Sequence, residues 1–133
     1  MGNRIESFED LDVYRIAFDL QQEIFQLTKK FPKEETYSLT DQVRRSSRSI
    51  GANITEAWAK RRYPAHFISK LSDSDGEQNE TRHWLRSAHA CNYISETDYA
   101  TLIDKCKVVG RKLGNMMQNA DNWIPKEFCK ADG

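Results

Sequence analysis

Basic side chains gather in one segment of this 133-residue chain, between residues 38 and 63. That segment carries six basic and two acidic side chains, whereas the whole chain has 20 of each and is neutral. The planar fork of a guanidinium group donates two hydrogen bonds at once, which suits a phosphate group. The segment therefore supplies two groups of candidate nucleic-acid-binding residues. They are Arg44, Arg45 and Arg48, followed by Lys60, Arg61 and Arg62.

The same arginines also have a purely structural interpretation. Asp12, Asp19 and Glu23 belong to the preceding apolar-periodic segment and are placed to pair with them. Exposed ion pairs of this kind are common on helices and need no ligand. Both interpretations stay open for a single subunit. In an oligomer the basic groups would add up to a larger positive surface.

A second set of polar residues is spaced for hydrogen bonding between helices. Asn53 and Glu56 are three residues apart, so they share a helix face. Residues 72–83 contain no large apolar side chain, although apolar residues flank them on both sides. We hypothesise a buried polar network between these stretches, because buried polar groups are tolerated only when paired. Its members would be Asn53, Glu56, Ser74, Gln78 and Thr81. The alternative is that the polar run faces water.

Catalytic and metal-binding motifs are weak in this sequence. Glu80 and His83 have the Glu-x-x-His spacing of di-iron bundles, but the motif has no second copy. The chain contains no phosphate-binding glycine loop and no nucleophile elbow. Cys91, Cys106 and Cys129 are too scattered for a zinc site, and we expect the first two to be buried thiols. We therefore predict a protein with no enzymatic activity, no cofactor and no metal.

Four long helices are predicted to position these residues. Apolar residues recur every three or four positions from about 8 to 30, from 38 to 62, and from 99 to 123. Pro64 suits the first turn of another helix, which we expect to continue through the polar residues 72–83. Three serine-x-x-aspartate pairs have the spacing of helix caps. They are Ser7 with Asp10, Ser38 with Asp41, and Ser95 with Asp98.

Short connections between four long helices imply antiparallel neighbours. The predicted fold class is all-α, an up-down-up-down antiparallel four-helix bundle over residues 8–124. Residues 1–7 and 125–133 would be a flexible N-terminus and a flexible C-terminal tail. Half of the residues from Phe8 to Phe31 are apolar, more than the roughly three in seven that one bundle interior needs. We expect a second subunit to cover the excess, and surplus core packing is the alternative.

No apolar run approaches the roughly 18 residues that read as a membrane-spanning helix. The first ten residues also lack an apolar signal region. We therefore expect a cytoplasmic protein that has no membrane partner.

Three runs of residues resemble a known protein family. They are FEDLDVYRIA from residue 8, FPKEETYSLTDQVRRSSRSIGANITEAW from residue 31, and LSDSDGEQNETRHWL from residue 71. These runs are similar to the four-helix bundle family encoded in 23S rRNA intervening sequences and to the accessory protein of diversity-generating retroelements. The resemblance covers about residues 8–123. Its most specific part is the pattern R-x-x-x-S-I-x-x-N-I-x-E. This pattern occurs at Arg45, Ser49, Ile50, Asn53, Ile54 and Glu56.

The resemblance implies an up-and-down bundle that assembles as a ring-like homopentamer and has no known enzymatic activity. The retroelement relatives bind nucleic acid and a reverse transcriptase through strongly basic surfaces. This chain departs from them in being neutral, and it has Ala57 where glycine is common. We therefore expect an oligomeric scaffold that binds RNA, DNA or a nucleoprotein complex. The alternative is a protein-binding adaptor with no nucleic-acid contact.

Overall fold

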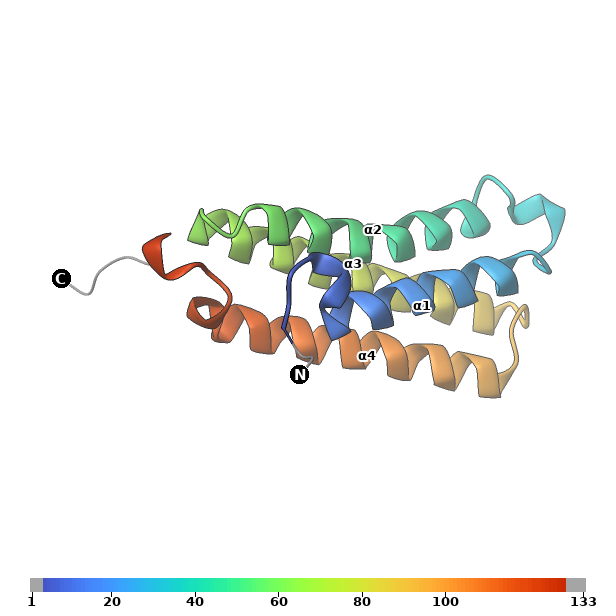
Figure 1. Cartoon of the computed structure of the whole chain (residues 1–133). Coiled ribbons are helices and arrows are strands. Elements are labelled where there is room, and N and C mark those ends of the chain that lie inside the picture. Colours follow the sequence, from blue (N-terminus) through green and yellow to red (C-terminus); the bar gives the residue numbers. More distant parts are fainter. Residues whose placement is uncertain (1–3, 129–133) are drawn as a thin grey trace.

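The computed structural model describes residues 4–128, and within them it contains helices and no strands. Four long helices pack against one another, as Figure 1 shows. Their bounds are α1 Asp12–Thr28, α2 Leu39–Ala59, α3 Pro64–Ala90 and α4 Glu96–Gln118. Short 3-10 helices flank them at Phe8–Asp10, Lys33–Glu35, Ala120–Asn122 and Lys126–Phe128. The predicted all-α class is confirmed.

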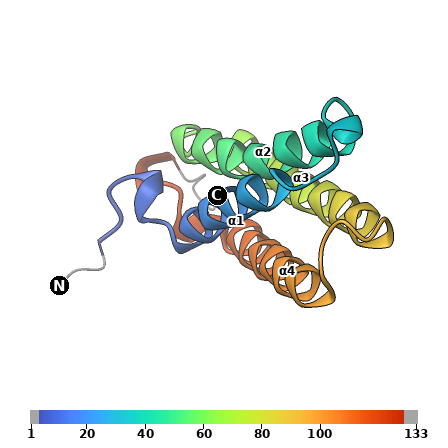
Figure 2. The ribbon, with the colours of Figure 1, turned by 90° about the vertical axis from the view of Figure 1, so that its right-hand side faces the viewer.

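Each long helix contacts the next one along the chain, and α1 also packs against α4. In the end view of Figure 2, α1 lies between α2 and α4. The interface between α2 and α3 is the most extensive. Two polar residues of α3, Ser74 and Thr81, lie in this interface.

Two of the three predicted caps form hydrogen bonds, but Ser7 begins the 3-10 helix Phe8–Asp10 instead of the long helix expected there, because Leu11 is extended and α1 starts at Asp12. Ser7 Oγ accepts from the Glu9 N–H at 3.2 Å, and Asp10 Oδ2 accepts from the N–H groups of Glu6 and Ser7. These backbone hydrogen bonds lower the pKa of Asp10. Ser95 Oγ accepts from the N–H of residue 98 at 3.0 Å and begins α4. Side-chain oxygens here satisfy N–H groups that have no partner within the helix.

The third predicted cap is wrong, because Ser38 precedes α2 but its side chain accepts no hydrogen bond there. Glu35 provides a different hydrogen bond at this helix start. Glu35 Oε1 accepts from the N–H of Leu39, the first residue of α2, at 3.3 Å. Its other oxygen accepts from the Tyr93 hydroxyl at 2.9 Å, which raises the pKa of Tyr93 to about 12. One carboxylate therefore ties the start of α2 to the turn between α3 and α4.

The hydrophobic core extends along all four helices. Helix α3 is continuous over 27 residues, as predicted, with proline in its first turn. Its apolar ends and its polar middle all contribute buried side chains. The largest fully buried side chains include Leu20, Ile24, Ile50, Ile54, Phe67, Leu71, Leu85 and Leu113. This shared core holds the two ends of α2 in fixed positions.

The cysteines differ from the expectation at one of two described positions. Cys106 is buried in α4, and burial raises the pKa of its thiol to about 12. Cys91 is exposed, because α3 ends one residue before it and the chain turns there, with Asn92 at φ 63°. The expectation of a buried Cys91 is therefore wrong. Cys129 and the ends of both predicted flexible segments, at 1–3 and 129–133, lie outside the described residues.

Candidate nucleic-acid interface

The six basic residues predicted for nucleic-acid binding form two separate groups at opposite ends of α2. Arg44, Arg45 and Arg48 lie on its early turns, and residues 60–62 follow directly after its last residue, Ala59. Because α2 has 21 residues and each residue adds about 1.5 Å, the two groups are separated by most of the helix. They are best considered as two sites on one helix.

At the start of α2, three cations surround the half-buried ring of Phe25 in α1. The distances to the ring centre are 4.7 Å from the Arg44 guanidinium, 5.4 Å from that of Arg48 and 4.9 Å from Lys29 Nζ. Arg44 Nε also donates to Thr28 Oγ1 at 2.8 Å. We call Phe25, Lys29, Arg44 and Arg48 the Phe25 cluster.

No carboxylate of residues 4–128 forms an ion pair with Arg44 or Arg48. Attraction to the negative face of an aromatic ring orients a cation and leaves its charge in place. Both guanidinium groups are therefore held in position while they keep their positive charge. With Arg45 and Asp41 they line a shallow groove of about 510 Å³.

Arg45 differs from its two neighbours because it pairs with acids of α3. Its guanidinium lies 3.6 Å from Glu77 and forms a hydrogen bond to Glu80, which raises the pKa of Arg45. Glu80 also accepts from Trp84 Nε1 at 3.0 Å. That bond, together with the one from Arg45, lowers the pKa of Glu80. Arg45 thus joins α2 to α3.

The acids of α1 pair with α4 instead of with the arginines. Asp12 lies 2.5 Å from Lys112, and Glu23 pairs with Lys105. The predicted pairing of α1 acids with the arginines of α2 is therefore wrong for these two residues. The reason is geometric, because α1 turns this face toward α4 while its Phe25 faces α2.

At the far end of α2, Arg61 packs against Trp58 of the same helix. Its guanidinium lies 3.6 Å from the centre of the Trp58 ring, and its Nε donates to the Trp58 carbonyl oxygen at 2.9 Å. Burial there lowers the pKa of Arg61. Arg62 lies near two other rings, 5.6 Å from Tyr63 and 4.7 Å from Phe128, and stays exposed. Lys60 is exposed as well.

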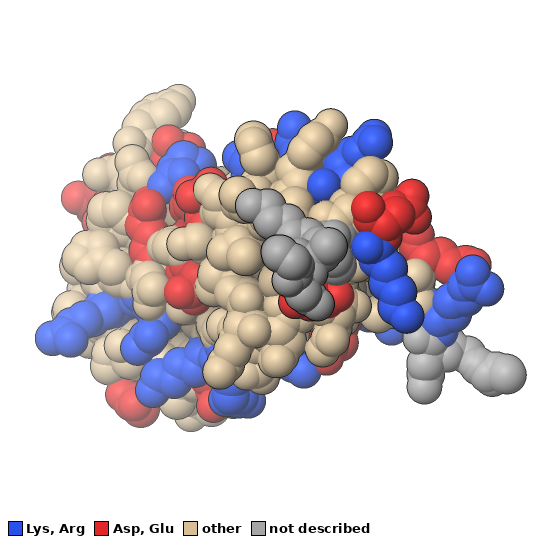
Figure 3. All heavy atoms as spheres, turned by 90° about the vertical axis from the view of Figure 1, so that its left-hand side faces the viewer, with Lys and Arg blue, Asp and Glu red and all other residues tan. Residues whose placement is uncertain are grey.

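Figure 3 views the molecule from this end, where α2 leads into α3. Basic side chains lie among acidic and uncharged ones on this face, without a continuous field of one sign. Any binding of phosphate here depends on a few positioned cations, since the net charge of the chain is zero.

The three polar residues predicted on α3 are buried, and two of them, Ser74 and Thr81, have partners on α2. Ser74 Oγ donates to the Ile50 carbonyl oxygen at 2.8 Å. The hydroxyl groups of Thr81 and Ser46 are 2.9 Å apart. Gln78 Nε2 donates to Asp75 Oδ1 at 3.0 Å, and Gly110 of α4 gives this amide room, because a Cβ there would lie 2.7 Å from it. We call the Ser74–Ile50 and Thr81–Ser46 contacts the α2–α3 seam.

Contrary to the hypothesis, Asn53 and Glu56 take no part in the α2–α3 seam, and Gln78 has its hydrogen-bond partner within α3. Asn53 Nδ2 donates to the Ser49 carbonyl oxygen of its own helix at 2.9 Å. Glu56 is exposed and lies 3.6 Å from Lys70. The sequence interpretation missed Ser46, although Ser46 is four residues before Ile50 and shares its buried face. The four-residue spacing from Ile50 could have indicated that Ser46 faces the interior.

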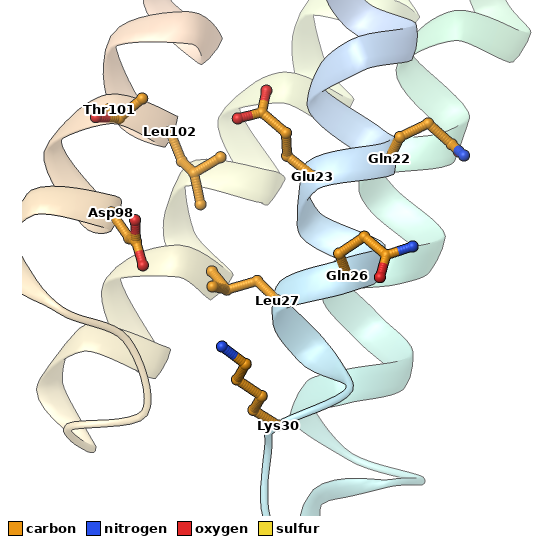
Figure 4. Close-up of a pocket in the computed structure, with 8 residues that line it drawn as sticks. All are labelled: Gln22, Glu23, Gln26, Leu27, Lys30, Asp98, Thr101 and Leu102. Carbon is orange, nitrogen blue, oxygen red and sulfur yellow. The ribbon is translucent and has the colours of Figure 1, made fainter.

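A different hollow, of about 540 Å³, lies between α1 and α4. In Figure 4, Leu27 and Leu102 face each other across it, and the charged ends of Lys30 and Asp98 point toward the same space. The sequence interpretation predicted no hollow here and named Asp98 only as part of a helix cap. Among residues 4–128 there is no group of three or more His, Cys, Asp or Glu residues placed to hold a metal ion. None of the described helices is long and apolar enough to cross a membrane.

Comparison with known protein families identifies the relatives of this chain. Residues 9–115 match the family described as 23S rRNA-intervening sequence protein. The chain belongs to this family. The matched range includes α1, α2, α3 and most of α4, and therefore both basic groups of α2.

The fold of this chain is similar to that of a protein with a solved crystal structure. It comes from Bacteroides thetaiotaomicron VPI-5482 and is described as a protein with unknown function from the S23 ribosomal protein family. It is 29% identical to this chain, with a TM-score of 0.73, and the match covers 80% of this chain and 95% of that one. No curated protein matches the sequence. The likeness to this solved structure supports the fold, and its description, a protein with unknown function, assigns no activity.

Proposed function

We propose that this family member is a non-enzymatic, homo-oligomeric scaffold of the cytoplasm that binds RNA, DNA or a nucleoprotein complex through α2. The observation that carries the proposal is the state of Arg44 and Arg48. The Phe25 ring contacts both guanidinium groups and Thr28 also binds Arg44, yet among residues 4–128 no carboxylate pairs with either guanidinium. Positioned guanidinium groups with uncompensated charge suit phosphate oxygens.

The proposed architecture is an up-down-up-down antiparallel bundle. Its support comes from the order of the contacts, because Ser46, Ile50 and Glu56 of α2 meet residues 81, 74 and 70 of α3 in turn. Rising numbers on one helix meet falling numbers on the next. Asp12 and Glu23 of α1 follow the same rule with residues 112 and 105 of α4.

The proposed assembly is a ring-like homopentamer, as the family resemblance implies. Phe18 on α1 supports an assembly, because its side chain is 42% exposed and stacks on Tyr14 at the surface of the chain. Several copies would place several Phe25 clusters on one particle. Weak phosphate contacts would then act together, which compensates for the neutrality of the single chain.

RNA is the first ligand to test, since the matching family is described by 23S rRNA intervening sequences. Fluorescence anisotropy of a labelled RNA would be measured at low salt with wild-type protein and with Arg44→Gln/Arg48→Gln. We expect the double variant to lose at least about tenfold in affinity, because two phosphate contacts per subunit disappear.

The matched control is Arg86→Gln/Arg111→Gln, which removes the same charge from exposed positions on α3 and α4. It should weaken RNA binding much less. Equal losses in both double variants would contradict a site on α2. A wild-type protein that binds neither RNA nor DNA at low salt would instead favour a protein-binding adaptor, the alternative that the neutral charge of the chain supports.

A further inference from the structure

The corner where α2 leads into α3 combines an exposed aromatic ring with cations. Tyr63 is 51% exposed. The Arg62 guanidinium lies 5.6 Å from the centre of its ring, and the His66 ring lies 5.8 Å away at an angle of 60°. Lys60, Arg62 and His66 are all exposed. We call Lys60, Arg62, Tyr63 and His66 the corner.

The backbone of the corner is fixed on both sides of Tyr63. The Tyr63 N–H donates to the Lys60 carbonyl oxygen at 2.8 Å, and the Tyr63 carbonyl oxygen accepts from the Phe67 N–H at 2.9 Å. Phe67 is completely buried, and Arg61 is held against Trp58. The chain is thus anchored from inside while Tyr63 faces outward. A ring on an ordered backbone loses little conformational entropy when a ligand stacks on it.

The electrostatic setting of the corner favours an anion. Within residues 4–128, neither Lys60 nor Arg62 forms an ion pair. The first turn of α3 contains no acidic residue, and a helix start carries partial positive charge. The nearest acidic residues in the sequence are Glu56 before the corner and Asp73 after it, and both lie within 4 Å of Lys70. A phosphate beside Tyr63 would therefore meet two available cations.

We propose that the corner binds single-stranded nucleic acid, with a base stacked on Tyr63 and a neighbouring phosphate held by Lys60 and Arg62. The inference rests on the proposed function and adds that the bound nucleic acid is single-stranded at this corner. Base–aromatic stacking needs a base whose face is free, which a single strand offers and a duplex interior does not. The Phe25 cluster has no comparable ring, because Phe25 is half-buried under its cations, so it contacts phosphate in either form.

The test compares one labelled RNA sequence as a single strand and as a duplex, by fluorescence anisotropy with the full chain. Tyr63→Ala should weaken single-strand binding about 5- to 100-fold and duplex binding less than about twofold, since one stacked base is lost. The single-stranded DNA of the same sequence should lose the same factor, because stacking uses the base and not the sugar. Tyr63→Phe keeps the ring and should restore affinity to within about twofold.

Tyr37→Ala is the matched control, because Tyr37 is 94% exposed and lies at the other end of α2. It should leave both affinities unchanged. Equal losses of single-strand and duplex binding in Tyr63→Ala, or no loss in either, would overturn the inference while leaving the proposed function intact. A wild-type protein that binds no nucleic acid at low salt would overturn both.

Discussion

The two ends of α2 carry similar basic residues in different surroundings. At the start, Arg44 and Arg48 lie against a half-buried ring and keep their charge. At the end, Arg62 lies beside an exposed ring, Tyr63, and also keeps its charge. The first arrangement offers positioned cations alone, whereas the second offers a cation and a stacking surface together.

Each end also contains one arginine whose guanidinium is engaged in contacts within the protein. Arg45 of α2 pairs with Glu77 and Glu80 of α3, and Arg61 packs against Trp58. The comparison teaches that the number of basic residues overstates the charge available to a ligand. Six basic residues on α2 reduce to four available cations, and tertiary contacts decide which four.

The largest stability effect should come from the α2–α3 seam, which keeps the two ends of α2 in a fixed relation. Thr81→Val leaves the buried Ser46 hydroxyl with only the Val43 carbonyl oxygen at 3.4 Å. It should cost about 1–3 kcal/mol, a decrease of about 3–10 °C in the thermal midpoint. Adding Ser46→Ala removes both partners and should recover much of that loss. Thermal melts followed by circular dichroism measure this cycle. Additive losses in the double variant would contradict a direct hydrogen bond between the two hydroxyl groups.

A smaller effect should separate Arg45 from Arg48. Arg45→Gln should lower the stability at neutral pH by less than about 1 kcal/mol, because the pair it breaks is partly exposed, and should weaken RNA binding less than Arg48→Gln does. Arg48→Gln should leave the stability unchanged.

The Arg45 effect should also depend on pH. The pKa of Glu80 is lowered in the folded state, so its stabilising contribution is present above its ordinary value near 4.5 and is lost as the pH falls through the lower folded pKa. The stability difference between wild type and Arg45→Gln should therefore shrink in acid. A difference that persists at low pH would show that Arg45 acts through packing.

Helical periodicity was sufficient to predict the four long helices and the continuity of α3, because the buried positions repeat along each helix. It also placed Ser74 and Thr81 toward a neighbouring helix. It did not predict their partners, because spacing tells which residues share a face and not how that face is turned. Asn53 is one position away from the buried Ile54, and that single step of rotation gives Asn53 a partner in its own helix.

The candidate site was predictable in composition and not in detail. The clustering of arginines on α2 is visible in the sequence, and so is Tyr63 beside Arg62. Sequence spacing does not predict which side chains meet in the folded chain. It therefore could not give the partners of Arg45, the ring under Arg44 or the packing of Arg61 on Trp58. The hydrogen bond from Leu39 to Glu35 at the start of α2 has the same origin, since Glu35 is also bound by Tyr93.

The salt dependence of RNA binding tests the central claim most directly. Affinity would be measured over a range of salt concentrations for wild type and for the variant with Arg44, Arg48, Lys60 and Arg62 changed to glutamine. A logarithmic plot for wild type should be a falling straight line, and the variant should lose roughly one unit of slope for each phosphate contact removed. An unchanged slope in a folded variant would place the phosphate contacts elsewhere and contradict the claim that these four cations of α2 form the nucleic-acid surface.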